Sequence, residues 1–148
     1  RDITPLLADA AALRDVVDAM IEPFAGTFDL VAGIEARGFI LAGAMSIASG
    51  TGLIPIRKAG KLPRPAASVD YALEYGTATI EAHDDIPEGA RVLLVDDILA
   101  TGGTLAAGRE LVQILGGVVV GTSMLLELDA LGGRAVCGDP DIHSLFHV

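Results

Sequence analysis

The chain has 148 residues, the size of one ordinary domain, and 51% of them are apolar while only 4% are aromatic. This composition excludes a disordered chain and predicts one domain over residues 1–148, with a core of small and branched aliphatic side chains. Twenty acidic and ten basic residues give a net charge of −10, which argues against a general binder of nucleic acid or of an anionic membrane.

Cysteine use and targeting signals predict the compartment. Cys137 is the only cysteine, so neither an internal disulfide nor a cysteine-based zinc site can form. Because no signal peptide is recognisable either, we expect a cytoplasmic protein. The longest uncharged stretch, residues 38–56, contains four glycines and Pro55, which favour a helix, a turn and a strand over a membrane span.

Hydrophobic periodicity predicts a first helix from Asp9, its expected N-cap, to a stop at Gly26. Apolar strands and helical segments then alternate. The expected strands cover 29–34, 53–57, 71–75, 77–81, 91–95, 118–128 and 142–148, the last as an edge strand, and the expected helices cover 38–49 and 104–115. Since most of these strands are apolar without alternation, we expect an α/β fold with a mostly parallel sheet of about five strands flanked by helices.

A basic segment over residues 58–70 lacks any periodicity, and we expect it to be a mobile loop. Four of the ten basic residues lie within eight positions at its start: Arg57, Lys58, Lys61 and Arg64. A solvated loop would explain this cluster, and so would a small anion-binding site.

The most informative stretch covers residues 92–104 and reads VLLVDDILATGGT. An apolar strand ends in two carboxylates, Asp96 and Asp97, and a Thr-Gly-Gly-Thr turn then opens a helix. Amides at the start of a helix suit a phosphate. Carboxylates beside them suit ribose hydroxyls or a hydrated Mg²⁺.

This stretch closely resembles the motif by which type I phosphoribosyltransferases bind 5-phosphoribosyl 1-pyrophosphate (PRPP). Four further blocks resemble the adenine branch of that family: RDITP at 1–5, GIEARGF at 33–39, IRKAGKLP at 56–63 and YALEYG at 71–76. The resemblance runs essentially from end to end. It implies the type I fold with a small hood, part of which we expect to precede Arg1, and a flexible loop over about 58–70.

The resemblance also implies a reaction and its site. The family transfers the 5-phosphoribosyl group of PRPP to adenine, giving AMP and pyrophosphate in purine salvage. Asp96 and Asp97 would contact the ribose. The 5′-phosphate would lie on Ala100, Thr101, Gly102, Gly103 and Thr104, and the pyrophosphate on Glu35, Ala36, Arg37, Arg57, Lys58 and Lys61. A non-proline cis peptide is implied between Glu35 and Ala36.

Further roles come from the same resemblance. Glu74 matches the residue that transfers a proton near N7 of adenine, while Arg1 and Ile98 match positions that contact the base. Tyr71 and Tyr75 would close over the site or pack. Mg²⁺ would be held mainly by substrate oxygens, without dedicated protein ligands, and the family implies a homodimer.

Two alternatives stay open. A phosphoribosyltransferase for another purine, such as xanthine, would share the PRPP and pyrophosphate elements. A regulator that senses PRPP without catalysis would need a DNA-binding extension and a basic surface, and it would have no use for Glu74 or the basic loop. Measuring turnover with each base distinguishes these two alternatives from transfer to adenine.

Overall fold

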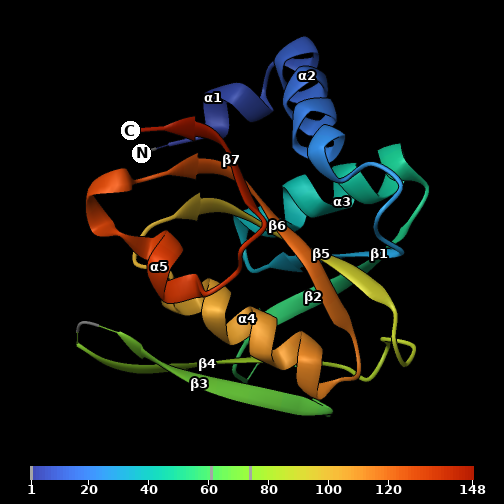
Figure 1. Ribbon diagram of the computed structural model, residues 1–148, viewed down its shortest axis with the longest axis vertical. Coiled ribbons are helices and arrows are strands. Elements are labelled where there is room, and N and C mark those ends of the chain that lie inside the picture. The colour runs from blue at the N-terminus through green and yellow to red at the C-terminus, as the bar shows by residue number, and fades with distance from the viewer. Residues whose placement is uncertain (1, 61, 74) are drawn as a thin grey trace.

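Parallel strands form most of a single seven-stranded sheet (Figure 1). The computed structural model describes residues 2–60, 62–73 and 75–148. The strands are β1 (Leu30–Ile34), β2 (Gly52–Lys58), β3 (Ala67–Leu73), β4 (Gly76–Ala82), β5 (Arg91–Leu99), β6 (Val118–Glu127) and β7 (Ile142–His147). Their order is β3-β4-β2-β1-β5-β6-β7.

Five neighbouring strands, β2, β1, β5, β6 and β7, are parallel, as expected, and β7 is an edge strand. The sheet is larger than the predicted five strands because the β3–β4 hairpin joins it. This hairpin pairs antiparallel only with the last two residues of β2, Arg57 and Lys58. It therefore extends the sheet at the end where the parallel strands finish.

Helices cover both faces of the sheet, each over its own apolar cluster (Figure 1). On one face lie α1 (Thr4–Leu7), α2 (Ala10–Ile21) and α3 (Arg37–Ser49). On the other lie α4 (Gly103–Ile114) and α5 (Gly133–Cys137), with 3₁₀ turns at Glu22–Phe24 and Asp129–Leu131 completing the chain. Successive β5 residues alternate between the two clusters, so this strand is buried on both faces.

The predicted first helix begins as expected, since the Asp9 side chain accepts a hydrogen bond from the amide of Ala12 at 3.1 Å. It ends at Ile21 rather than near Gly26, because Pro23 lacks an amide hydrogen and the chain tightens into a 3₁₀ turn. Residues 38–56 divide between α3 and β2. No helix in the described part of the chain is long and apolar enough to cross a membrane.

Two predicted boundaries near the site are wrong. The acidic pair does not end the fifth strand, because β5 continues through Asp96 and Asp97 to Leu99, still paired with β6. The loop predicted over 58–70 is shorter, because β3 begins at Ala67 and Lys58 belongs to β2. Pairing with neighbouring strands, which local composition does not reveal, extends both elements.

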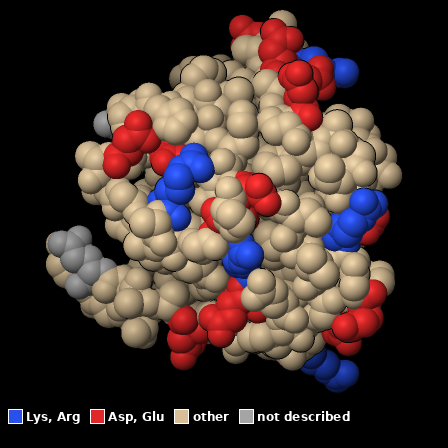
Figure 2. Space-filling view, viewed as in Figure 1, with Lys and Arg blue, Asp and Glu red and all other residues tan. Residues whose placement is uncertain are grey.

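Charge on the face shown in Figure 2 is mixed. Lys and Arg side chains are separated from one another there, and acidic side chains lie among them. Among the described residues, this face therefore presents no continuous basic stripe of the kind that follows a nucleic-acid backbone.

Helix α3 lies against β1 through a glycine. A Cβ atom built on Gly33 would come within 2.6 Å of the Ala42 Cβ and 2.9 Å of the Gly38 carbonyl oxygen. Gly33 and Ala42 are therefore a complementary pair, and any larger side chain at position 33 would displace the helix that follows the strand.

We predict that Gly33→Ala lowers the free energy of unfolding by about 1–3 kcal/mol, because the new methyl group overlaps Ala42. Ala42→Gly should cost about 1 kcal/mol or more alone, through lost helix propensity and burial, yet relieve part of the overlap in the double variant. Denaturant unfolding of all four proteins measures the coupling. Additive losses would show that the two side chains do not compete for this space.

Candidate active site

Three adjacent parallel strands bring polar residues to one edge of the sheet. β1 leads into Glu35 and Ala36, β5 ends after the acidic pair, and β2 ends at Arg57 and Lys58. The carboxyl ends of parallel strands are the usual place for ligands in such sheets. The topology therefore gathers, at one edge, the residues that the sequence predicted to act together.

The turn after β5 is built to expose backbone amides. Gly102 has φ +88°, a left-handed conformation that glycine adopts without strain, and α4 starts at the next residue. Because glycine has no side chain to cap the helix, the first amides of α4 are left for another acceptor. A hollow of about 70 Å³ lies in front of them, lined by Asp96, Ile98, Leu99, Ala100, Thr101, Gly102, Thr104 and Leu105.

Asp96 borders this hollow from inside the sheet, and Asp97 is the next residue of β5. Asp97 is only 7% exposed. The Asp97 amide donates to Asp96 Oδ1 at 2.9 Å, and the Ile98 amide donates to Asp97 Oδ1 at 2.8 Å. Burial, followed by the neighbouring Asp97 charge, raises the pKa of Asp96 well above its ordinary value.

Arg37, the first residue of α3, supplies the nearest positive charge. Its Nε lies 2.8 Å from Asp97 Oδ2, and this oxygen has no aligned hydrogen-bond donor among the described residues. Next to it, a Cβ on Gly38 would come within 2.8 Å of Asp96 Oδ1, so α3 approaches the pair through bare backbone. Asp97 Oδ2 is thus a buried acceptor suited to a hydroxyl group.

The loop between β1 and α3 connects the acidic pair with the end of β2. The peptide bond between Glu35 and Ala36 is cis, at the place implied by the sequence. Glu35 Oε1 accepts hydrogen bonds from Arg57 Nε and from the Lys58 amide, both at 3.0 Å. The Arg57 guanidinium also lies 5.6 Å from the centre of the Phe39 ring, which fixes its place further.

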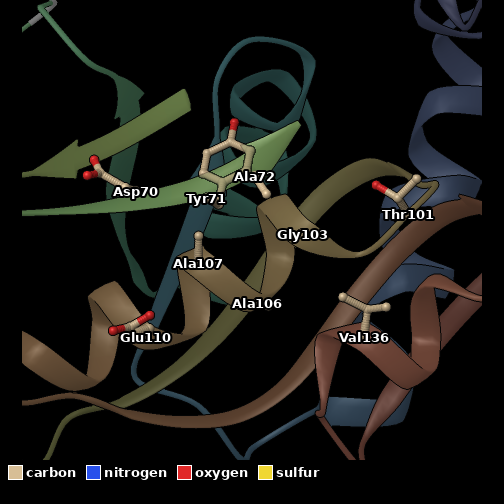
Figure 3. A pocket seen from close by; sticks show the side chains of 9 residues that line it. All are labelled: Asp70, Tyr71, Ala72, Thr101, Gly103, Ala106, Ala107, Glu110 and Val136. Atoms are coloured by element: carbon tan, nitrogen blue, oxygen red, sulfur yellow. The ribbon is translucent and has the colours of Figure 1, made fainter. Parts of the chain in front are cut away.

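A second, larger cavity of about 390 Å³ lies between β3 and α4, beside the same turn (Figure 3). Tyr71 and Ala72 form one side, small residues of α4 form the floor, and Val136 of α5 closes the end. Thr101 contributes to both this cavity and the smaller hollow. Tyr71 therefore packs beside the turn, whereas Tyr75 is 94% exposed.

The structure brings most of the predicted site residues together. Asp96, Ile98 and four of the five turn residues line one hollow, and Arg37 connects it to the loop after β1. Gly103 lines the neighbouring cavity instead. The predictions for Arg1, Lys61 and Glu74 lie outside the described residues.

Sequence reasoning missed α5, which lies directly behind the turn. A Cβ on Gly133 would come within 2.9 Å of Leu99 Cδ1 and would overlap the Ala100 carbonyl oxygen. The helix has only five residues and no apolar periodicity that a pattern could detect. The double glycine at 132–133 was the available signal.

One further group among the described residues has the composition of a metal site: Glu127, Asp129 and His147. However, Glu127 Oε1 already accepts from Arg134 Nη2 and from Ser144 Oγ, both at 2.6 Å. His147 Nδ1 lies 2.8 Å from Asp129 Oδ1. These contacts give all three side chains a structural partner.

Comparison with known proteins agrees with this geometry. A family model described as the phosphoribosyl transferase domain matches residues 3–134. The adenine phosphoribosyltransferase of Renibacterium salmoninarum is 58% identical over 146 residues, covering 98% of this chain and 80% of the relative. This chain belongs to the phosphoribosyltransferase family.

Solved phosphoribosyltransferase structures share the whole fold. The adenine phosphoribosyltransferase of Rhodothermus marinus matches with a TM-score of 0.95 and 45% identity, over 99% of this chain and 85% of the other. The Saccharomyces cerevisiae enzyme, complexed with an imino-altritol bisphosphate and adenine, matches with a TM-score of 0.91 and 35% identity, over 97% and 85%. The predicted type I phosphoribosyltransferase fold is confirmed.

The raised pKa of Asp96 predicts that this phosphoribosyltransferase sacrifices stability at its site. A carboxyl whose pKa is higher in the folded than in the unfolded chain stabilises the fold while protonated, below about pH 4. That contribution is lost as the pH rises through the raised pKa. At pH 7 this carboxyl therefore contributes less to the stability of the fold than it does below pH 4.

We predict that Asp96→Asn raises the free energy of unfolding at pH 7 by on the order of 1 kcal/mol or more, because the Asp96 carboxyl ionises more readily in the unfolded chain and Asn does not ionise in either state. The gain should shrink below pH 4. Denaturant unfolding at both pH values measures it, with Asp15→Asn on the exposed side of α2 as the control, expected within about 0.5 kcal/mol of wild type. An Asp96→Asn variant that is less stable than wild type at pH 7 would contradict the raised pKa of Asp96 in the folded protein.

Proposed function

We propose that the protein transfers the 5-phosphoribosyl group of PRPP to adenine, forming AMP and pyrophosphate. One observation carries the proposal. A hollow at the carboxyl edge of the sheet joins the uncapped amides of a helix start to Asp96, whose neighbour Asp97 is buried. A molecule that carries both a phosphate and a ribose fits this arrangement, because the amides can bind the phosphate while the carboxylates accept hydrogen bonds from the ribose hydroxyls.

In this reaction N9 of adenine attacks C1′ of the ribose while the bond from C1′ to pyrophosphate breaks. The amides and hydroxyls of Thr101–Thr104 hold the 5′-phosphate and so fix the ribose. Asp97 Oδ2, which lacks an aligned donor among the described residues, accepts a hydrogen bond from a ribose hydroxyl. The negative pair Asp96–Asp97 also stabilises positive charge that develops on the ribose ring.

The departing pyrophosphate lies at the loop after β1 and the end of β2. Arg37 and Arg57 supply charge there, together with Lys58 and, by resemblance, Lys61. Glu35 orients Arg57 and the Lys58 backbone through its hydrogen bonds. These cations stabilise the charge that pyrophosphate gains as it leaves.

Adenine lies over Ile98 in the proposed complex, and the resemblance also assigns a contact with the base to Arg1. Glu74, as a carboxylate, accepts the proton that adenine loses from N7 as N9 forms its new bond. The resemblance supports these roles for Arg1 and Glu74. Glu74 follows β3, whose neighbouring residues Tyr71 and Ala72 line the cavity beside the turn.

Mg²⁺ is the proposed cofactor, and when bound it neutralises the pyrophosphate oxygens. The residues at the hollow fit such a role, because Asp96 presents a carboxylate there, beside the expected ribose hydroxyls. Substrate oxygens supply most of the ligands of the metal.

The buried Cys137 thiol is consistent with the proposed cytoplasmic location.

The test is turnover of PRPP and Mg²⁺ with adenine, hypoxanthine, guanine or xanthine, followed by detection of nucleotide and pyrophosphate. We predict AMP from adenine alone, and no product when the metal is chelated. Asp96→Asn combined with Asp97→Asn should lower kcat/KM by about 100-fold or more while the protein stays folded.

Each other outcome has a defined meaning. Turnover of another base would keep the chemistry and change the specificity. PRPP binding without turnover by any base would support a sensor instead. Wild-type activity in the double variant would contradict the ribose site.

We also propose that the protein is a homodimer, which the resemblance supports. Helices α2 and α3 border an apolar groove of about 740 Å³ on the protein surface. Ile47 on its rim is 86% exposed, and Ile40 on the same helix is 47% exposed. Exposed apolar patches of this kind favour burial against another protein surface. A second copy of this chain is the proposed occupant.

We predict that the wild-type protein sediments as a dimer and that Ile47→Glu shifts it to monomer, because a charge in a buried apolar contact is unfavourable. Ile114→Glu is the matched control, since Ile114 is 56% exposed on α4, away from the groove. A monomeric wild type, or equal behaviour of both variants, would contradict this interface.

A further inference from the structure

The first turn of α5 packs against the back of the proposed phosphate-binding turn, backbone against backbone. A Cβ on Gly102 would overlap the Gly133 carbonyl oxygen, and one on Gly133 would overlap the Ala100 carbonyl oxygen. Figure 1 shows α5 beside α4. With no side chain between them, a shift of Gly133 is transmitted directly to Gly102.

The residue after Gly133 is held by three hydrogen bonds. Arg134 Nη2 and Nε donate to the two carboxylate oxygens of Glu127, at 2.6 and 3.3 Å, and Nη1 donates to the Ile142 carbonyl at 2.8 Å. A two-pronged pair of this kind fixes orientation as well as distance. The short helix is thereby connected to β6 and β7.

Glu127 is itself firmly placed. It is 6% exposed and also accepts from Ser144 Oγ at 2.6 Å. The hydrogen bond from Arg134 lowers the pKa of Glu127 in spite of its burial. Glu127 pairs in register with Leu99, the last residue of β5 before the turn, so the ion pair is anchored where the turn begins.

A second ion pair fastens the chain beyond α5 to α4. Arg109 Nη1 lies 3.2 Å from Asp139 Oδ1, and the buried Asp139 also accepts from Thr122 Oγ1 at 2.6 Å. Two largely buried carboxylates thus hold a segment of only a few residues. In both pairs the carboxylate is buried while the arginine stays partly exposed, so each pair fixes one geometry around a buried acceptor.

We propose that Arg134 is a positioning residue, which through Glu127 holds Gly133 against Gly102 and so aims the amides of the turn at the 5′-phosphate. The inference rests on the proposed function of that turn. It adds a requirement outside the hollow itself, since Arg134 does not line it. Loss of the ion pair should therefore weaken recognition of the phosphate and leave recognition of adenine unchanged.

The test compares Arg134→Gln with wild type in two measurements. We expect KM for PRPP to rise about 10- to 100-fold and KM for adenine to stay within about twofold, because a small misplacement of binding groups has effects of this size. In binding experiments the affinity for AMP should fall by a similar factor, while that for adenosine, which lacks the phosphate, should not change. If Arg134 were needed only for the stability of the fold, its loss would lower the affinities for AMP and for adenosine together.

Two further variants complete the design. Arg134→Lys keeps the charge but loses the two-pronged geometry, so an intermediate rise in KM for PRPP is expected, and it serves if the Gln variant does not fold. Arg91→Gln is the control, because it breaks an exposed ion pair with Asp29 at the opposite end of β5. It should change neither KM.

The outcomes separate the positioning role from the site on which it depends. A folded Arg134 variant with KM for PRPP within twofold of wild type overturns the positioning role alone, provided that wild type binds AMP more tightly than adenosine. If wild type binds the two equally, the turn is not a phosphate site and both proposals fall.

Discussion

Two adjacent carboxylates on β5 impose the constraint around which the site is arranged. Asp96 and Asp97 lie within the paired length of the strand, beside the centre of the sheet, and burial there disfavours the charge of Asp96. Nearby groups stabilise the negative charge of the pair. Two backbone amides donate hydrogen bonds to it, and the Arg37 guanidinium forms an ion pair with Asp97. A ligand with hydroxyl groups and developing positive charge would complete the compensation.

The site also depends on helices whose backbones approach β5 and the following turn closely. Gly38 lets α3 approach Asp96, and Gly102 with Gly133 lets α5 support the turn from behind. Helices without intervening side chains move little relative to the strands, so the amides and carboxylates keep their spacing. Burying acidic groups lowers the free energy of unfolding, but it leaves the binding groups preorganised for the ligand.

The sequence predicted most of the parallel sheet, because buried parallel strands are apolar throughout and their helices follow at regular intervals. It also predicted that Asp96, Thr101 and Thr104 act together, since motif residues at a strand end remain close in any fold of this type. It failed where contacts outside the local segment decide: β5 extends past the acidic pair, β3 begins inside the predicted loop, and the short helix α5 packs its Gly133 against Ala100.

We propose that the turn after β5 and the acidic pair bind one molecule that carries both a phosphate and a ribose. Amide NMR spectra recorded during titration with ribose 5-phosphate test this binding. We expect the largest changes in the amide signals of Thr101–Thr104, Asp96 and Asp97. Largest changes at the α2–α3 groove, or none at saturating ligand, would contradict it.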